Sequence, residues 1–165
     1  MMSTQEVYRT LLSPFIFPPT VLVVDEANDV RDLLCESIFT AGFIVLPANN
    51  ADETLEHLKI VIPDAVLLDA TSPDIGGFDL GRRIKSIPDW IRIPILFMIE
   101  QANAQQIIGS YENGGIDYIS KPLCIPEVLA RLLTCVTART HAREHKAFAE
   151  CLQCHAIHLP RPPLH

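Results

Sequence analysis

Short apolar runs alternate along the chain with longer segments in which apolar residues recur every three or four positions. Continuous apolar runs are typical of strands buried on both faces, and the longer periodic segments are typical of helices. The pattern predicts strands at residues 21–24, 43–46, 65–68, 93–98 and 116–119. It predicts helices at residues 28–41, 52–60, 78–87 and 103–111, and a long helix that begins near Pro126.

These strand–helix units follow one another without an internal sequence repeat. Because crossovers between parallel strands are right-handed, the units predict a doubly wound five-stranded parallel sheet. We expect the flavodoxin-like strand order 2-1-3-4-5, with an extended C-terminal helix. The folded domain is predicted to span residues 20–138.

Two flanking segments stand outside this alternation. Residues 1–19 are interpreted as an N-terminal arm, in which Val7, Tyr8, Leu11 and Leu12 form one or two amphipathic turns before prolines interrupt them. Residues 139–165 are predicted to be a helical extension and a tail that contains proline, histidine and cysteine.

Composition narrows the class of protein. The net charge of −7 argues against a nucleic-acid surface, and no apolar run has the length of a membrane span. The five cysteines are scattered and odd in number, which favours reduced thiols in a cytoplasmic protein.

Charged residues follow three of the predicted strands, at the edge of a parallel sheet where ligands gather. Asp25 and Glu26 follow the first strand, Asp69 follows the third, and Lys121 follows the fifth. Three carboxylates brought together favour Mg²⁺, which is a hard ion and prefers oxygen ligands. A cation beside Asp69 would leave its carboxylate able to attack a phosphoryl group, and Lys121 would contact the phosphoryl oxygens.

These segments resemble the receiver domain of two-component response regulators, of the chemotaxis type. The segment 21–26 (VLVVDE) resembles the family's acidic pair, and Asp69 with the following Pro73 and Gly76-Gly77 resembles its phosphoacceptor motif. The segment 117–122 (DYISKP) resembles its Lys-Pro motif.

The resemblance implies a role for each matching residue. Asp69 would accept a phosphoryl group from a histidine kinase, and Lys121 would contact that group. Asp25, Glu26, Asp69 and the Thr71 carbonyl would hold Mg²⁺. Tyr118 would be the aromatic switch, and the Lys121–Pro122 bond is often cis in the family.

The fourth strand departs from the family pattern. Ile99 and Glu100 stand where related receivers place a hydroxyl residue and then a small residue. Two interpretations therefore remain open. One is a single-domain response regulator, not an enzyme, that signals to a downstream protein. The other is a degenerate receiver that acts as a phosphorylation-independent binding or dimerisation module.

The tail segment Cys151-Leu152-Gln153-Cys154-His155 matches the Cys-x-x-Cys-His form of haem attachment, and zinc ligation is the other metal use of such residues. We assign neither haem nor zinc, because nothing in the sequence indicates the export route that haem attachment needs. The expected partners are a histidine kinase or phosphotransfer protein, a downstream protein target and a second copy of the chain. No nucleic-acid or membrane partner is expected.

Overall fold

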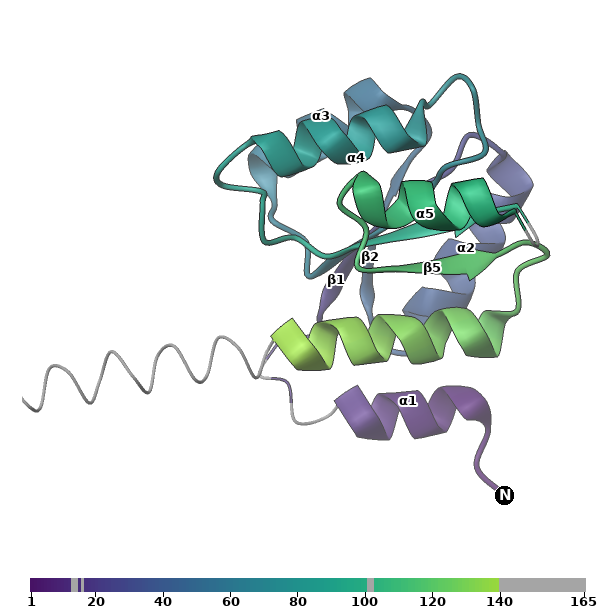
Figure 1. The fold of residues 1–165 in the computed structure, drawn as a ribbon. Helices are drawn as coiled ribbons and strands as arrows, with labels where there is room; N and C mark the ends of the chain where they lie inside the picture. The colour runs from purple at the N-terminus through teal and green to yellow at the C-terminus, as the bar shows by residue number, and fades with distance from the viewer. Residues whose placement is uncertain (13–14, 16, 101–102, 140–165) are drawn as a thin grey trace, which may run out of the picture.

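A five-stranded parallel sheet forms the centre of the computed structural model, which describes residues 1–12, 15, 17–100 and 103–139 (Figure 1). Its strands run in the order β2-β1-β3-β4-β5, and every neighbouring pair is parallel. The strands are β1 (Thr20–Val24), β2 (Ile44–Ala48), β3 (Ala65–Asp69), β4 (Ile95–Ile99) and β5 (Asp117–Ser120). The doubly wound, flavodoxin-like fold is therefore confirmed.

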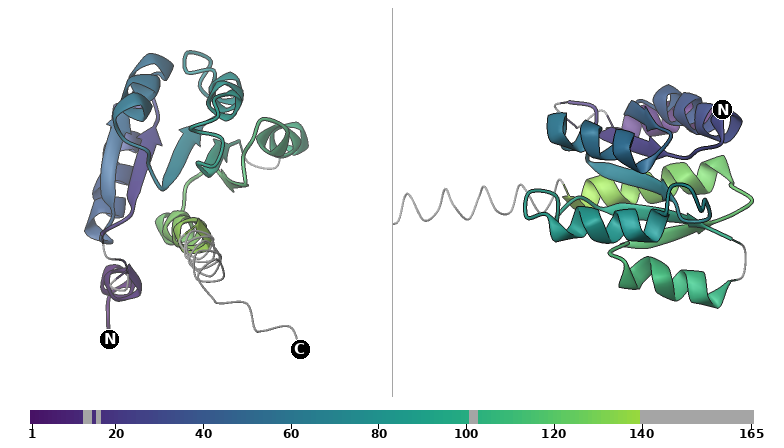
Figure 2. Two further views of the ribbon diagram at one scale, coloured as in Figure 1. Left: turned by 90° about the vertical axis from the view of Figure 1, so that its left-hand side faces the viewer. Right: turned by 90° about the horizontal axis from the view of Figure 1, so that it is seen from above.

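Helices cover both faces of this sheet (Figures 1 and 2). One face carries α3 (Ala51–Ile60), α4 (Gly77–Ser86) and α5 (Ala104–Glu112). The other carries α2 (Asn28–Thr40) and a C-terminal helix that is helical over residues 125–139. The residues that form the helices match the predicted segments, because apolar periodicity marks the buried side of each one.

The strands are apolar throughout because each side of the sheet packs on helices. Val21 and Val23 belong to the core under α2 and the C-terminal helix, whereas Leu22 and Val24 belong to the core under α3 and α4. Successive side chains of a strand point to opposite faces, so a fully covered strand needs apolar residues at every position. The first polar residue after such a run therefore falls at the strand tip.

The N-terminal segment packs on the domain, which changes the interpretation of residues 1–19 as an arm. It forms α1 (Thr4–Leu12), whose first turn is closed by reciprocal bonds: Ser3 N–H donates to Glu6 Oε2 at 2.7 Å, and Glu6 N–H donates to Ser3 Oγ at 3.2 Å. Tyr8 and Leu12 are buried in the core beneath α2 and the C-terminal helix. The helix thus adds apolar contacts at the end of the sheet opposite the charged strand tips.

Two further predictions concern membrane-spanning helices and the C-terminal tail. In the part of the chain that the structure describes, no helix combines the length and apolarity that crossing a membrane requires. The Cys-x-x-Cys-His segment, with Cys151, Cys154 and His155, and the helical extension beyond residue 139 lie outside the described residues.

Candidate functional site

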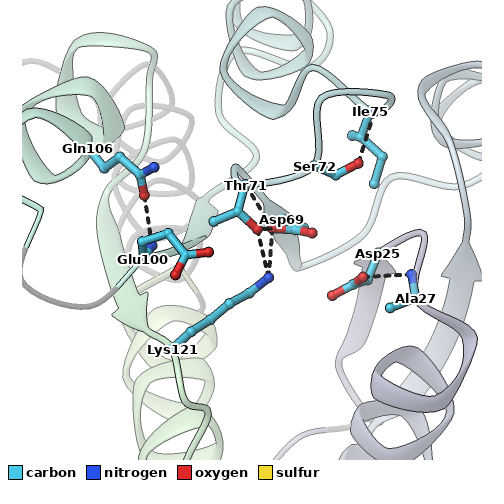
Figure 3. Close-up of polar contacts among 9 residues, drawn as sticks. All are labelled: Asp25, Ala27, Asp69, Thr71, Ser72, Ile75, Glu100, Gln106 and Lys121. Carbon is cyan, nitrogen blue, oxygen red and sulfur yellow. Dashed lines mark hydrogen bonds and ion pairs between the residues drawn. The ribbon is translucent and has the colours of Figure 1, made fainter.

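The tips of β1, β3 and β5 bring the predicted charged residues to one edge of the sheet (Figure 3). Asp25 directly follows β1, Asp69 is the last residue of β3, and Lys121 directly follows β5. Together with Glu26 and Thr71, these residues line a single cavity of about 490 Å³. The sequence prediction that these five positions share one site is consistent with this geometry.

Asp69 is held by three hydrogen bonds, all to the same carboxylate oxygen. Its Oδ1 atom accepts from the Thr71 N–H at 2.8 Å, from the Thr71 hydroxyl at 2.7 Å and from Lys121 Nζ at 3.1 Å. No donor among the described residues bonds its Oδ2 atom. Because a nucleophile needs an unshared lone pair, Oδ2 is the oxygen free to attack.

Glycine at the start of α4 allows the helix to approach the acceptor strand closely. A Cβ atom placed on Gly77 would lie 2.2 Å from the Asp69 carbonyl oxygen, which no real side chain could tolerate. Gly76, at the helix N-cap, has a positive φ of 60° that favours glycine. The Gly76-Gly77 pair therefore fixes the loop that frames Asp69.

Asp25 is a buried carboxylate with only one oxygen satisfied. Its Oδ1 atom accepts the Ala27 N–H at 2.9 Å, but its Oδ2 atom is buried without a hydrogen-bond partner. Burial raises the pKa of Asp25, and the negative charge of Asp69 acts in the same direction. The Ala27 N–H, Lys121 and Arg31 oppose this rise in pKa. An unpaired buried oxygen of this kind is costly unless a cation or a proton joins it.

The residues present fit a magnesium ion, although within the described ranges no three acidic, histidine or cysteine side chains are gathered closely enough to hold a metal. The orphaned Oδ2 of Asp25, the Asp69 carboxylate and the exposed Glu26 carboxylate supply hard oxygen ligands around one cavity. To hold the ion, these three side chains would have to draw closer together than they are here. That the Thr71 carbonyl adds a ligand stays a prediction.

Lys121 supplies the positive charge of the site. Its ammonium group bonds Asp69 Oδ1 at 3.1 Å and Thr71 Oγ1 at 2.8 Å, and its side chain is about a quarter exposed. The Lys121–Pro122 peptide bond is cis, as the resemblance implied. An ammonium group that reaches the cavity while staying partly solvated can follow an incoming phosphoryl group.

The predicted switch positions lie apart from the cavity. Ile99 is fully buried in the core beneath α3 and α4, and Glu100 is exposed; neither lines the cavity. The Glu100 N–H donates to Gln106 Oε1 at 2.7 Å, on the far side of Asp69 from Asp25 (Figure 3). Tyr118 is half-buried, with its ring edge-on to Tyr111 at a centroid distance of 6.2 Å.

Three features of the site were not predicted from the sequence. The Thr71 side chain bridges Asp69 and Lys121, and Gln106 binds the end of β4. An aspartate side chain often bonds the backbone two residues on, so the bond from the Thr71 N–H to Asp69 could have been anticipated, whereas the hydroxyl bridge to Lys121 could not. The third is an apolar wall on one side of the cavity, formed by Val30, Leu33, Leu34, Leu123 and Ile125.

Comparison with known proteins identifies the family. The sequence profile described as "Response regulator receiver domain" matches residues 21–133. The phosphate regulon transcriptional regulatory protein PhoB of Rhizobium meliloti is 28% identical over 143 residues, covering 87% of this chain and 61% of that protein. The response regulator MprA of Mycolicibacterium vanbaalenii is 32% identical over 115 residues, covering 70% of this chain and 49% of that protein.

A solved structure is similar in both fold and sequence. A putative response regulator from Chloroflexus aurantiacus superposes with a TM-score of 0.69 at 30% identity, over 73% of this chain and 98% of that one. The chain therefore belongs to the response regulator receiver family. It spans about half to three fifths of the length of these two curated relatives, neither of which confirms the chemotaxis-type assignment.

Replacement of Asp25 tests the role of its orphaned oxygen. Because the folded state binds the Asp25 proton more tightly than the unfolded chain, folding loses stability as the pH rises and this carboxyl ionises. Asp25→Asn keeps an oxygen for the Ala27 N–H but removes the buried charge. We expect a higher Tm than that of the parent at pH 7 without Mg²⁺, and no further rise when Mg²⁺ is added.

Differential scanning calorimetry with and without Mg²⁺ measures both effects. The control is Asp89→Asn, since Asp89 is exposed and does not line this cavity. If Mg²⁺ raises the Tm of Asp25→Asn as much as that of the parent, Asp25 is not a ligand of the ion.

Proposed function

We propose that this receiver domain accepts a phosphoryl group on Asp69 from a histidine kinase or phosphotransfer protein and passes the signal on by protein–protein contact. The observation that carries the proposal is the Asp69–Lys121 pair: a 3% exposed carboxylate with one oxygen free and a lysine ammonium held 3.1 Å from the other. Two-component signalling is the setting in which this family works.

The residues of the site suggest how the transfer would proceed. Asp69 Oδ2 would form a bond to phosphorus as the bond from phosphorus to the donor nitrogen breaks, and the donor imidazole would keep the electron pair. Lys121 would follow the phosphoryl oxygens as negative charge builds on them. Magnesium held by Asp25, Glu26 and Asp69 would supply further charge neutralisation.

The finer parts of this proposal extend beyond the family assignment. We propose a signalling domain rather than an enzyme with turnover, working in the cytoplasm with a kinase or phosphotransfer partner and a downstream protein. That it acts as a single domain stays a prediction, since the curated relatives are longer than the matched region.

Phosphorylation at Asp69 can be tested directly with a small phosphodonor. We expect incubation with acetyl phosphate and Mg²⁺ to add one phosphoryl mass to the parent protein, and to add none to Asp69→Asn, which lacks the nucleophilic oxygen. Intact-mass spectrometry measures the adduct. Asp74→Asn is the control, because Asp74 is another acidic residue of the same loop and does not line the cavity. An adduct that survives in Asp69→Asn would move the acceptor elsewhere.

The degenerate-receiver alternative is favoured by one specific observation. At the end of β4 the buried Ile99 offers no hydroxyl, and the Glu100 N–H is already bonded to Gln106. A ligand shifts a two-state equilibrium only by its differential affinity for the two states. In a receiver without a phosphoryl contact on β4, phosphorylation would change the conformation of the loop between β4 and α5 only weakly.

Restoring that contact should strengthen the response. A hydrogen bond to a charged acceptor contributes about 1.5–3 kcal/mol. Ile99→Thr combined with Glu100→Ala is therefore expected to raise the ratio of active to inactive conformation by roughly tenfold or more, because 1.4 kcal/mol is a factor of ten. Amide NMR around Tyr118 during a beryllofluoride titration with Mg²⁺ measures the shift. A parent protein that already shows the full shift would refute the proposal that Ile99 and Glu100 weaken the conformational response.

Self-association is the remaining element of the proposed function. Ile108 and Tyr111 on α5, and Ile116 just before β5, are each about half exposed. Large apolar side chains exposed on neighbouring elements favour a partner surface. We expect the parent to form dimers and Ile108→Glu to weaken them. Ile60→Glu changes an exposed residue of α3, on a different part of the surface, and should leave the dimers intact. Light scattering over a concentration series measures the mass, and a parent that stays monomeric throughout would exclude the dimer.

A further inference from the structure

The Thr71 hydroxyl lies at the centre of the charged cluster. It donates to Asp69 Oδ1 at 2.7 Å and accepts from Lys121 Nζ at 2.8 Å (Figure 3). Its oxygen thus joins the acceptor carboxylate to the lysine, and its proton points at the carboxylate. Among the described residues, it is the one side-chain hydroxyl for which a bond to Asp69 is found.

At the end of β4, the described residues offer no comparable donor. Ile99 is apolar and fully buried, and the Glu100 N–H is taken by Gln106 Oε1. Among the described residues, the hydroxyl that already bonds Asp69 therefore lies on the β3 side of the site.

We propose that the Thr71 hydroxyl is the side-chain donor to the phosphoryl group and ties that group to the loop between β3 and α4. The inference rests on the proposed phosphorylation of Asp69. When Oδ2 becomes bonded to phosphorus, the negative charge leaves the carboxylate and gathers on the phosphoryl oxygens. The two side-chain donors that now bond Oδ1, Thr71 and Lys121, then gain more by bonding the phosphoryl oxygens, since hydrogen bonds to charged acceptors are the stronger ones.

Hydrogen bonds within the loop connect Thr71 to the start of α4. Ser72 Oγ accepts the Ile75 N–H at 3.3 Å, and the Ser72 carbonyl accepts the Gly76 N–H at 3.2 Å. Movement of Thr71 toward a phosphoryl group would pull on this turn and on Gly76, where α4 begins. The signal would thus leave the site through residues 70–77 rather than through the loop that follows β4.

The test replaces Thr71 by its isostere without the hydroxyl. Thr71→Val keeps the shape and the backbone N–H, and Thr71→Ser restores a hydroxyl. Thr134→Val is the matched control, because it makes the same replacement at an exposed residue of the C-terminal helix that does not line the cavity. Each variant is titrated with beryllofluoride and Mg²⁺, and amide NMR records the apparent affinity and the residues that shift.

We expect Thr71→Val to bind beryllofluoride several-fold, and at most about tenfold, more weakly. The hydroxyl already bonds the Asp69 carboxylate in the free protein, so only the difference between the two bonds is lost. Thr71→Ser should recover the affinity, and Thr134→Val should match the parent. In the parent, the shifts should be larger at residues 70–77 than around Tyr118, and Thr71→Val should remove them.

The outcomes separate this inference from the proposed function. Equal affinity and equal shifts in the parent and in Thr71→Val would overturn the role of Thr71 while leaving Asp69 as the acceptor. A weakening that Thr71→Ser does not reverse would overturn it as well, because the hydroxyl would then not be the cause. A parent that does not bind beryllofluoride at Asp69 would overturn both.

Discussion

The ion pair between Asp69 and Lys121 is the contact on which the rest of the site depends. The two residues are 52 positions apart, and β4 lies between their strands. A carboxylate only 3% exposed needs a cationic partner to offset the cost of its burial, and the lysine can reach it only if all three strands end at the same level. The parallel register of β3, β4 and β5 meets that requirement, so the sheet both builds the fold and sets the position of the charge.

A second constraint opposes stability on the acidic side of the same cavity. Asp25 is buried with one unpartnered oxygen beside another carboxylate, an arrangement that raises its pKa. An apolar residue there would suit folding better. A buried, unpartnered carboxylate is typical of a preformed ligand site. A cation that binds there offsets the free-energy cost of burying the carboxylate and so stabilises the folded state.

The position of hydroxyl donors decides which loop can respond to a group on Asp69. On the β4 side, apolar packing of Ile99 and the bond from Glu100 to Gln106 keep the strand end independent of the acceptor. On the β3 side, Thr71 already bonds both charged partners. The side chains that bond Asp69 thus come from the loop after β3 and from the end of β5.

The pattern of residues along the chain was enough to predict the fold and the placement of the charges. Apolar runs and helical periodicity are local, so they predicted every strand and helix of the sheet layers. Asp25, Asp69 and Lys121 could be placed at one edge because parallel strands end together. The tertiary structure decided the rest. Packing of α1 on the core, the bridge made by Thr71, and the bond between Glu100 and Gln106 depend on where distant surfaces and side chains meet. A hydrogen bond forms only within about 3 Å and at a suitable angle, which residue spacing along the chain does not specify.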